Sequence, residues 1–266
     1  MTSIRGRALV TGATGGLGQA IARALAARGA EVVVTGRRAE LLEPLAAEIG
    51  GRALPCDLAD RPAVDALAGG AGEIEILVAN AGLPAAGPLE DFSAAQVDRA
   101  LDVNLRAPVL LAHALMPPMV ARGHGHLVFV NSLAGKASTG GQSLYAATKY
   151  GLRGFALGLR EDLAPAGVGV STVFPGFIRE AGMFADTGVR LPRGVGTRTP
   201  ADVSRAVVEA IERDRGEVDV APLGLRVGAT VAGVFPRVGW AVRRRIPGSD
   251  QVAGDLAAAP SHRAKR

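Results

Sequence analysis

Tyr145 and Lys149 are spaced so that their side chains could do acid–base chemistry together. They lie four residues apart in SLYAATKYG, residues 143–151, and on a helix this spacing places both side chains on one face, about 5–6 Å apart at Cβ. A phenol titrates near pH 10, so its pKa must fall by about two to three units before it can act as a base near neutrality. A lysine ammonium about 4 Å away could supply on the order of 4 kcal/mol toward that shift. An isolated pair of this kind is more often an ordinary pair on a helix surface, and both interpretations stand at this point.

A glycine-rich turn supplies a second candidate site. The stretch TGATGGLG occupies residues 11–18, between a strand-like run and a helical pattern. Gly12, Gly16 and Gly18 allow a tight turn and a close approach of backbone N–H groups to a pyrophosphate, beside a helix N-terminus that favours negative charge. The turn therefore predicts a dinucleotide-binding site, which we expect Thr14 and Leu17 to share.

The second and third strand-like runs end in charged residues that bear on the choice of cofactor. Gly36, Arg37 and Arg38 stand where an NAD-preferring site would carry an acidic residue. Arginine can hold a 2′-phosphate through charge-assisted hydrogen bonds, so these residues favour NADP(H) over NAD(H), although one or both arginines, and Arg38 above all, could instead begin a solvated helix. Asp57 could accept the adenine amino group or cap a helix, and we expect the adjacent Leu58 to lie beside the cofactor.

Short Val- and Leu-rich runs alternate with longer segments whose apolar residues recur at helical spacing. The strand-like runs are residues 8–11, 31–35, 52–56, 74–79, 126–131, 168–174 and 217–220. This alternation predicts an α/β fold with a doubly wound parallel sheet of about seven strands and helices on both faces, in a single domain. We expect residues 1–222 to form this catalytic domain, with residues 177–199 as a candidate mobile loop over the site.

The order of short motifs along the chain is more specific than any one of them. Ser132 precedes Tyr145 by 13 residues, and the glycine-rich turn comes before both. The other motifs, in order, are NAG at 80–82, VNL at 103–105, NSLAGK at 131–136 and PG at 175–176. This ordered set resembles the short-chain dehydrogenase/reductase family over about residues 7–220.

The resemblance implies a Rossmann-like fold and an NAD(P)-dependent oxidoreductase that interconverts a secondary alcohol and a ketone. It implies that Tyr145 is the catalytic acid/base, that Lys149 is its partner and a ribose ligand, and that Ser132 orients the substrate carbonyl. Asn104 would take part in a water-linked proton relay. It further implies a homodimer or homotetramer that uses the helix carrying Tyr145. The remaining residues implied to contact the cofactor are Asn80, Ala81, Gly82, Pro175, Gly176 and Ile178.

Several of these residues have structural alternatives. Asn80 could serve only to satisfy backbone groups at a strand end, and Asn104 could only cap or kink a helix. Tyr150 points about 100° round the helix from Lys149 and is interpreted as a packing residue. The four histidines show no metal-ligand spacing, so no metal site is predicted. Two rival functions also stay open, a non-catalytic protein that senses NADP(H) and a membrane-surface adaptor.

The loop after the sixth run departs from the family pattern. Four positions beyond Gly176, where the family often has a hydroxyl residue, stands Glu180. Its carboxylate could accept a hydrogen bond from the nicotinamide carboxamide, but it would also repel phosphate charge. Four apolar residues suggest a roof over the site that suits a lipophilic alcohol or ketone, or else ordinary core packing: Phe177, Ile178, Met183 and Phe184.

The C-terminal residues 223–250 are the second departure. Apolar residues between Val227 and Val242 fall on one stripe of a helix, and three arginines follow at 243–245. Pro236 and four glycines argue against one straight helix. This amphipathic extension could pack against the body or a partner subunit, or contact an anionic membrane surface through residues 223–246. Residues 251–266, rich in alanine and basic, are predicted to be a disordered tail.

The composition favours a globular protein and argues against nucleic-acid binding. Hydrophobic residues make up 48% and charged residues 21%, which suits an aliphatic core. The formal charge of +5 arises in residues 237–266, which hold 7 Lys and Arg against 2 Asp and Glu and leave 23 of each sign elsewhere, so no basic groove is expected. The single Cys56, the lack of a signal-peptide pattern and the lack of an 18-residue apolar stretch favour a cytoplasmic protein, which could lie at the inner face of a membrane.

Overall fold

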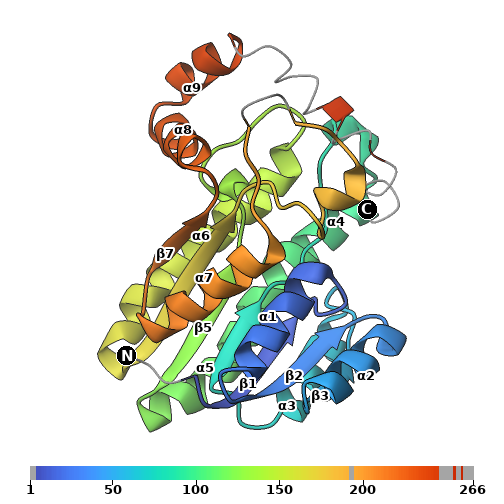
Figure 1. Ribbon diagram of the computed structural model, residues 1–266, viewed down its shortest axis with the longest axis vertical. Coiled ribbons are helices and arrows are strands. Elements are labelled where there is room, and N and C mark those ends of the chain that lie inside the picture. Colours follow the sequence, from blue (N-terminus) through green and yellow to red (C-terminus); the bar gives the residue numbers. More distant parts are fainter. Residues whose placement is uncertain (1–3, 192–194, 246–253, 256–258, 260–266) are drawn as a thin grey trace.

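A seven-stranded parallel sheet runs through the centre of the molecule (Figure 1). The computed structural model describes residues 4–191, 195–245, 254–255 and 259. The strands are β1 (Gly6–Thr11), β2 (Ala30–Gly36), β3 (Arg52–Pro55), β4 (Ile76–Ala79), β5 (Gly125–Val130), β6 (Val168–Pro175) and β7 (Glu217–Val220). Their boundaries lie within two residues of the predicted runs, and the predicted doubly wound α/β fold is confirmed.

The strand order is β3-β2-β1-β4-β5-β6-β7. The chain therefore leaves β1 in one direction to form β2 and β3 and returns to the other side of β1 with β4. In such sheets the crevice for a ligand lies outside the carboxyl ends of the strands, at the point where the order reverses. Here that point lies between β1 and β4, whose carboxyl ends carry the glycine-rich turn and the NAG motif.

Helices cover both faces of the sheet (Figure 1). They are α1 (Gly16–Ala26), α2 (Ala39–Glu48), α3 (Arg61–Gly70), α4 (Ala94–Leu101), α5 (Ala107–Arg122), α6 (Ser143–Leu163), α7 (Pro200–Glu212), α8 (Leu223–Val234) and α9 (Pro236–Arg243). Helices α1, α2 and α7 pack on one face, and α3, α5 and α6 pack on the other. The strands between them are nearly continuous apolar runs, as expected for a parallel sheet buried on both faces; every residue of β5 is buried.

Short helical turns link several of these elements. They are the 3₁₀ turns η1 (Leu89–Asp91), η3 (Leu133–Gly135), η4 (Ala164–Ala166) and η5 (Ala185–Thr187), and the π-helical turn η2 (Asp102–Arg106) between α4 and α5. Helix α7 begins with a capping box in which Thr199 and Asp202 bond each other's backbone N–H groups. The loop that precedes α7 is therefore anchored at its far end.

The C-terminal extension forms two helices instead of one. Helix α8 ends at Val234, and α9 begins at Pro236, as expected because proline cannot continue a helix ladder. Both stand apart from the sheet at one end of the molecule (Figure 1). Among the residues that the structure describes, no helix is long and apolar enough to cross a membrane. The predicted tail, 251–266, lies outside the described residues except for 254, 255 and 259.

Candidate active site

Ser132, Tyr145 and Lys149 lie together beyond the carboxyl end of β5. Ser132 is the second residue after β5, and the other two side chains come from the first two turns of α6. The Ser132 and Tyr145 hydroxyls share a hydrogen bond. The Lys149 ammonium lies 5.7 Å from the centre of the Tyr145 ring and donates to the Val130 carbonyl oxygen at 3.3 Å. The structure thus joins all three residues in one constellation.

The protonation of this constellation differs from the expectation. Burial raises the pKa of the Tyr145 hydroxyl to about 12, and the hydrogen bond with Ser132 only partly opposes this rise. Burial also lowers the pKa of Lys149 to about 8. The expected lowering of the tyrosine pKa by Lys149 is therefore wrong for the protein alone, because the ammonium is turned toward the Val130 carbonyl and both groups are removed from water. Tyr145 is a phenol at neutral pH and is suited to donate a proton.

Asn131 holds the two halves of the constellation together. Its side-chain Nδ2 donates to the backbone oxygen of Lys149 at 3.0 Å, and its Oδ1 accepts from the backbone N–H of Ser132 at 2.9 Å. The buried amide thus links the end of β5 to the second turn of α6. The sequence analysis did not single it out as a site residue; its position directly before Ser132 was the available signal.

Asn104 lies one layer behind Lys149, in the π-helical turn η2. Its side chain is buried and bonds both backbone groups of Leu83, accepting from N–H at 2.6 Å and donating to the carbonyl at 3.0 Å. It also donates to the Thr148 hydroxyl at 3.4 Å. A β-carbon on Gly82 would lie 3.5 Å from the Asn104 oxygen and 3.8 Å from the Lys149 nitrogen, so both polar groups flank Gly82. Asn104 thus fastens the NAG segment to η2, which supports its structural interpretation and leaves its role in a proton relay as a prediction.

The glycine-rich turn is shaped to receive a phosphate group. Gly12 has φ +68°, and a β-carbon there would lie 2.7 Å from the Ala81 Cα atom. A β-carbon on Gly18 would collide with the Gly12 carbonyl oxygen. None of the described side chains caps the N-terminus of α1 at Gly15. The first backbone N–H groups of α1 therefore have no side-chain acceptor among the described residues, as in anion sites at helix N-termini, and a dinucleotide pyrophosphate fits this turn.

Asn80 closes the other side of this crevice. Its backbone N–H donates to the Thr11 hydroxyl at 3.0 Å, and its side-chain amide donates to the carbonyl oxygens of Thr11 at 2.9 Å and Gly12 at 3.4 Å. The Ala81 N–H donates to the same hydroxyl. These hydrogen bonds support the structural interpretation of Asn80, in which it satisfies backbone groups at a strand end and so holds the turn in shape, and its contact with the cofactor stays a prediction.

Arg37 and Arg38 lie exposed at the end of β2, beside the glycine-rich turn. The Arg38 guanidinium donates to the Thr14 carbonyl at 3.4 Å, so it leans over the turn. Asp57 accepts from the Ala59 N–H at 3.0 Å and pairs with Arg99 at 3.0 Å. The interpretation of Asp57 as a helix cap is wrong, because α3 begins after Asp60. The adjacent Leu58 is buried in the core.

A cavity of about 800 Å³ extends from the paired hydroxyls to the C-terminal helices. Pro175 and Gly176 form part of its wall, and all four residues of the predicted roof line it. Three of the four are partly exposed, whereas Ile178 is also buried in the core. Glu180 points away: it is exposed, has φ +74° and pairs with Arg179 at 3.1 Å. Next to it, Ala181 packs against Gly16, so this loop touches the glycine-rich turn.

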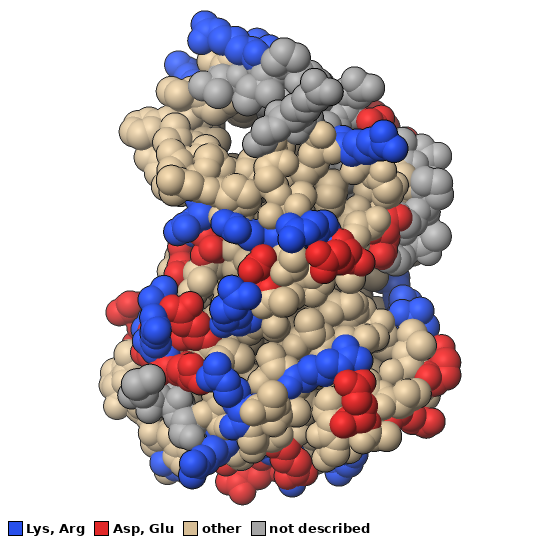
Figure 2. All heavy atoms as spheres, viewed as in Figure 1, with Lys and Arg blue, Asp and Glu red and all other residues tan. Residues whose placement is uncertain are grey.

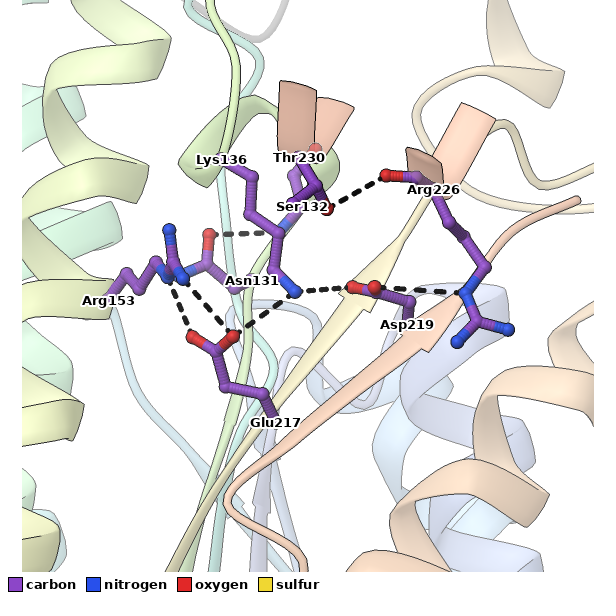
Figure 3. Close-up of polar contacts among 8 residues, drawn as sticks. All are labelled: Asn131, Ser132, Lys136, Arg153, Glu217, Asp219, Arg226 and Thr230. Carbon is purple, nitrogen blue, oxygen red and sulfur yellow. Dashed lines mark hydrogen bonds and ion pairs between the residues drawn. The ribbon is translucent and has the colours of Figure 1, made fainter. Parts of the chain in front are cut away.

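Lys136, four residues after Ser132, is buried at the centre of a partly exposed ion cluster (Figure 3). Its ammonium contacts Asp219 at 2.7 Å and Glu217 at 3.2 Å, and it stacks 4.1 Å from the centre of the Phe174 ring. Arg153 of α6 pairs with the same glutamate at 2.7 Å, and Arg226 of α8 lies 3.8 Å from the aspartate. The cluster therefore ties the loop after Ser132 to β7, α6 and α8. Sequence reasoning missed it because its members lie far apart along the chain.

Tyr150 also differs from its interpretation as a packing residue. It is 40% exposed, lines the cavity, and donates from its hydroxyl to the Lys136 carbonyl at 2.6 Å. The Lys136 backbone is thus held by α6, while its side chain is held by β7.

The single thiol, Cys56, is buried, and burial raises its pKa to about 11, so it is unreactive near neutrality.

Comparisons with known proteins agree with this geometry. Residues 7–189 match the family described as short chain dehydrogenase. A ketoacyl reductase, HetN, from Nostoc sp. (strain PCC 7120) is 37% identical over 83% of this chain and 80% of its own length. Nodulation protein G of Rhizobium sp. (strain N33) is 43% identical over 68% of this chain and 77% of its own. A short-chain dehydrogenase from Sphingobium yanoikuyae, solved with NADPH, superposes with a TM-score of 0.76 at 27% identity, covering 90% of this chain and 97% of the other.

Proposed function

Since this chain belongs to the short-chain dehydrogenase family and is an oxidoreductase of hydroxyl and keto groups, we propose that it interconverts a lipophilic ketone and its secondary alcohol with NADP(H). The observation that carries the proposal is the pair of hydroxyls, Ser132 and Tyr145, hydrogen-bonded to each other at one end of an apolar cavity. A carbonyl oxygen placed between them would receive two hydrogen bonds.

The proposed roles follow from the contacts of these side chains. A bound reduced nicotinamide would supply hydride to the carbonyl carbon. Ser132 holds the carbonyl oxygen, and Tyr145 transfers its hydroxyl proton to that oxygen, which leaves an alcohol and a phenolate. Lys149 stabilises the phenolate by its charge and would bind the cofactor ribose. A proton returns from water by way of the Lys149 ammonium, and Asn104, which like Lys149 flanks Gly82, would hold a water molecule of this relay.

The proposed preference for NADP(H) rests on the end of β2. Two exposed guanidinium groups stand there, at Arg37 and Arg38, and the second leans over the glycine-rich turn. A 2′-phosphate would accept charge-assisted hydrogen bonds from them. The relative from Sphingobium binds NADPH, which supports the same assignment. The remaining proposed cofactor contacts come from the turn, the NAG segment, Asp57 and Leu58, and Pro175, Gly176 and Ile178.

The proposed substrate is apolar around its keto group. The cavity walls are mainly aliphatic and aromatic, with Phe177 and Phe184 in ring contact at 5.0 Å between centroids. The name of the Nostoc relative, a ketoacyl reductase, supports a keto group as the reacting group. An apolar chain attached to such a group would fill the space toward α8 and α9.

We also propose a homodimer or homotetramer that pairs through α6. The outer face of this helix is formed by small residues, including Ala147, Gly151, Gly154 and Gly158, with the exposed Leu157 among them. A flat face of this kind lets two helices approach closely.

A cytoplasmic location is proposed as well, because the buried free thiol of Cys56 suits a reducing compartment. Contact of residues 223–246 with a membrane is a separate proposal, because the proposed enzyme activity does not depend on it.

A panel of ketones tested with NADPH and NADH, followed by absorbance of the reduced cofactor, examines the proposed function. We expect faster oxidation of NADPH with apolar ketones, and a loss of at least about a hundredfold in kcat for Tyr145→Phe, which keeps the ring and removes the proton. Hydride transfer by this variant at the parental rate would sink the mechanism. Tight NADPH binding without turnover of any ketone would instead favour a non-catalytic protein that senses the cofactor.

A further inference from the structure

The two C-terminal helices expose an unusual amount of apolar surface. Seven of the twelve large apolar side chains that are exposed in the described part of the chain lie between residues 223 and 240, and helix α8 buries none of its residues. The seven are Leu223, Val227, Val231, Val234, Phe235, Val238 and Trp240, each between 40% and 70% exposed. Apolar side chains concentrated on one surface mark a contact with another molecule or a membrane.

The charge of this surface has one sign. Residues 223–245 contain five arginines and no aspartate or glutamate. Of these, Arg226, Arg237, Arg244 and Arg245 are exposed, and basic side chains gather at the far end of the helices (Figure 2). Elsewhere on the face shown, basic and acidic side chains are mixed (Figure 2). An apolar face with only positive charge beside it suits a surface that is both apolar and anionic.

A lipid bilayer with anionic headgroups has both properties. A second copy of the chain fits less well, because pairing this surface with itself would bring together the arginines of both copies without any acidic residue on either. Helices α8 and α9, of 12 and 8 residues, are far too short to span a bilayer. Helices of this composition lie in the interface, with apolar side chains among the acyl chains and arginines at the headgroups.

The inner side of the same helices forms a wall of the active-site cavity. Gly228, Ala229 and Ala232 of α8, and Gly239 of α9, line the cavity that begins at Ser132 and Tyr145. The exposed side chains of Val231, Val238 and Trp240 line it too, so the cavity and the outer apolar surface are continuous. By contrast, Leu223, Val227, Val234 and Phe235 are exposed and do not line the cavity.

We propose that α8 and α9 dock on an anionic bilayer and that a substrate dissolved in the bilayer passes between these helices and the sheet into the cavity. The identity of the reacting group rests on the proposed function, whereas the docking does not. Helix α8 is held to β7 because Arg226 reaches Asp219 of the ion cluster (Figure 3), and it is held to the loop after Ser132 because Gly233 packs against the Lys136 carbonyl. Docking would therefore place the mouth of the cavity against the acyl chains.

Sedimentation of the full-length protein with vesicles tests the docking. One vesicle is pure phosphatidylcholine, and the other holds equal parts of phosphatidylcholine and phosphatidylglycerol. We expect the anionic vesicles to bind about tenfold more protein, with less binding at high salt. The single tryptophan, Trp240, lies on the docking surface, so its emission should shift to the blue on binding. Wild-type protein that stays in the supernatant with both vesicles would overturn the proposal.

A double variant, Val234→Asp with Phe235→Asp, separates docking from chemistry because neither residue lines the cavity. It should lose vesicle binding and keep its rate with a short, water-soluble ketone, but lose several-fold in rate with a long-chain methyl ketone dissolved in anionic vesicles. Leu41→Asp on α2 is the matched control, an exposed leucine far from the docking surface, and should behave as the parent. Equal binding by the double variant and the parent would refute the docking surface.

Three other outcomes of these experiments would distinguish docking from self-association and from catalysis. If the double variant loses a self-association that the parent shows without vesicles, the surface is an interface between copies and the proposal is wrong. If the protein binds vesicles but reduces neither ketone, the proposed function fails and the docking stands. If the parent and the double variant reduce the long-chain ketone at equal rates although only the parent binds the vesicles, passage of substrate from the bilayer is refuted.

Discussion

The Lys149 ammonium lies 5.7 Å from the centre of the Tyr145 ring and donates its hydrogen bond to the Val130 carbonyl, 3.3 Å away. The two side chains share a helix face, but in the protein alone the cation is bound to the backbone and not to the phenol. Both groups are removed from water, and both pKa values move toward the neutral form: that of Tyr145 rises to about 12, and that of Lys149 falls to about 8. Near neutral pH the burial of the Lys149 charge therefore costs stability, whereas Tyr145 is neutral in both the folded and the unfolded state and adds no such cost.

Replacing Lys149 with methionine should stabilise the protein while it abolishes activity. The lysine pKa falls from 10.5 in the unfolded chain to about 8 in the folded protein. The free energy of unfolding therefore decreases as the pH drops from 10.5 to 8, and below pH 8 the decrease due to this group is complete. Lys149→Met removes this cost, which is about 3 kcal/mol near pH 7. Thermal melts at pH 7 and pH 10 should show the larger gain at pH 7. A variant less stable than the parent at pH 7 would show that burying the ammonium does not lower the free energy of unfolding.

His126 should make the protein sensitive to mild acid. It is buried in β5, its Nε2 lies 2.8 Å from the Ser171 hydroxyl, and burial lowers its pKa from 6.5 to about 4, with the opposing charges of Asp214 and Arg160 nearby. The unfolded chain takes up the proton first, so stability is complete above pH 6.5 and falls by about 3 kcal/mol as the pH drops to 4.

Urea unfolding of His126→Phe and of the parent between pH 4 and pH 7 tests this dependence. The variant should show a flatter curve, whatever its stability at pH 7. His124→Gln is the control, because His124 is a neighbouring histidine with a side chain that is 58% exposed. A parental slope in the His126 variant would assign the acid sensitivity to other groups.

Asn131 should act as a positioning residue for the two hydroxyls. Asn131→Asp keeps the shape of the side chain but replaces the N–H donor to the Lys149 carbonyl with a second acceptor. We expect kcat to fall by roughly ten- to a hundredfold, since small displacements of reacting groups have effects of this size, and KM for NADPH to change little. Steady-state kinetics with both cofactor and ketone varied would measure this. An unchanged kcat would mean that Ser132 and α6 keep their places without the amide.

Removing Lys136 should destabilise the protein far more than removing a surface cation. Lys136→Met leaves the carboxylates of Glu217 and Asp219 without their buried cation, at a cost of about 3 kcal/mol. The matched control is Arg213→Met, which removes an exposed partner of Glu209 and should cost less than about 1 kcal/mol. Denaturant unfolding at pH 7 would compare them. Similar losses in both variants would argue that the cluster adds nothing beyond an exposed pair.

Arg37→Asp should turn the cofactor preference toward NADH. A carboxylate at the end of β2 would repel a 2′-phosphate and accept hydrogen bonds from ribose hydroxyls. We expect kcat/KM for NADPH to fall by at least about tenfold relative to that for NADH. Arg205→Asp, on a 72% exposed side chain of α7, serves as the charge control. A cofactor ratio equal to that of the parent would place the 2′-phosphate elsewhere.

Much of the fold was readable from local patterns because the rules that link them to structure act over short distances. The Val- and Leu-rich runs at 126–131 and 168–174 became β5 and β6, since such runs form buried parallel strands. The C-terminal extension is divided into α8 and α9 at Pro236, as expected because proline has no backbone N–H to continue a helix. By contrast, Asp57 was compatible with a helix cap in sequence, and only the position of α3 decided against it.

By itself, the sequence determined the order of the motifs, the alternation that builds the parallel sheet, and the common helix face of Tyr145 and Lys149, because these depend on spacing within one element. The tertiary structure decided where the Lys149 ammonium points, how the buried phenol titrates, which carboxylates surround Lys136, and that α8 stands with its apolar side chains exposed. Each of these depends on burial and on contacts between segments far apart along the chain, and such contacts exist only after the sheet has assembled.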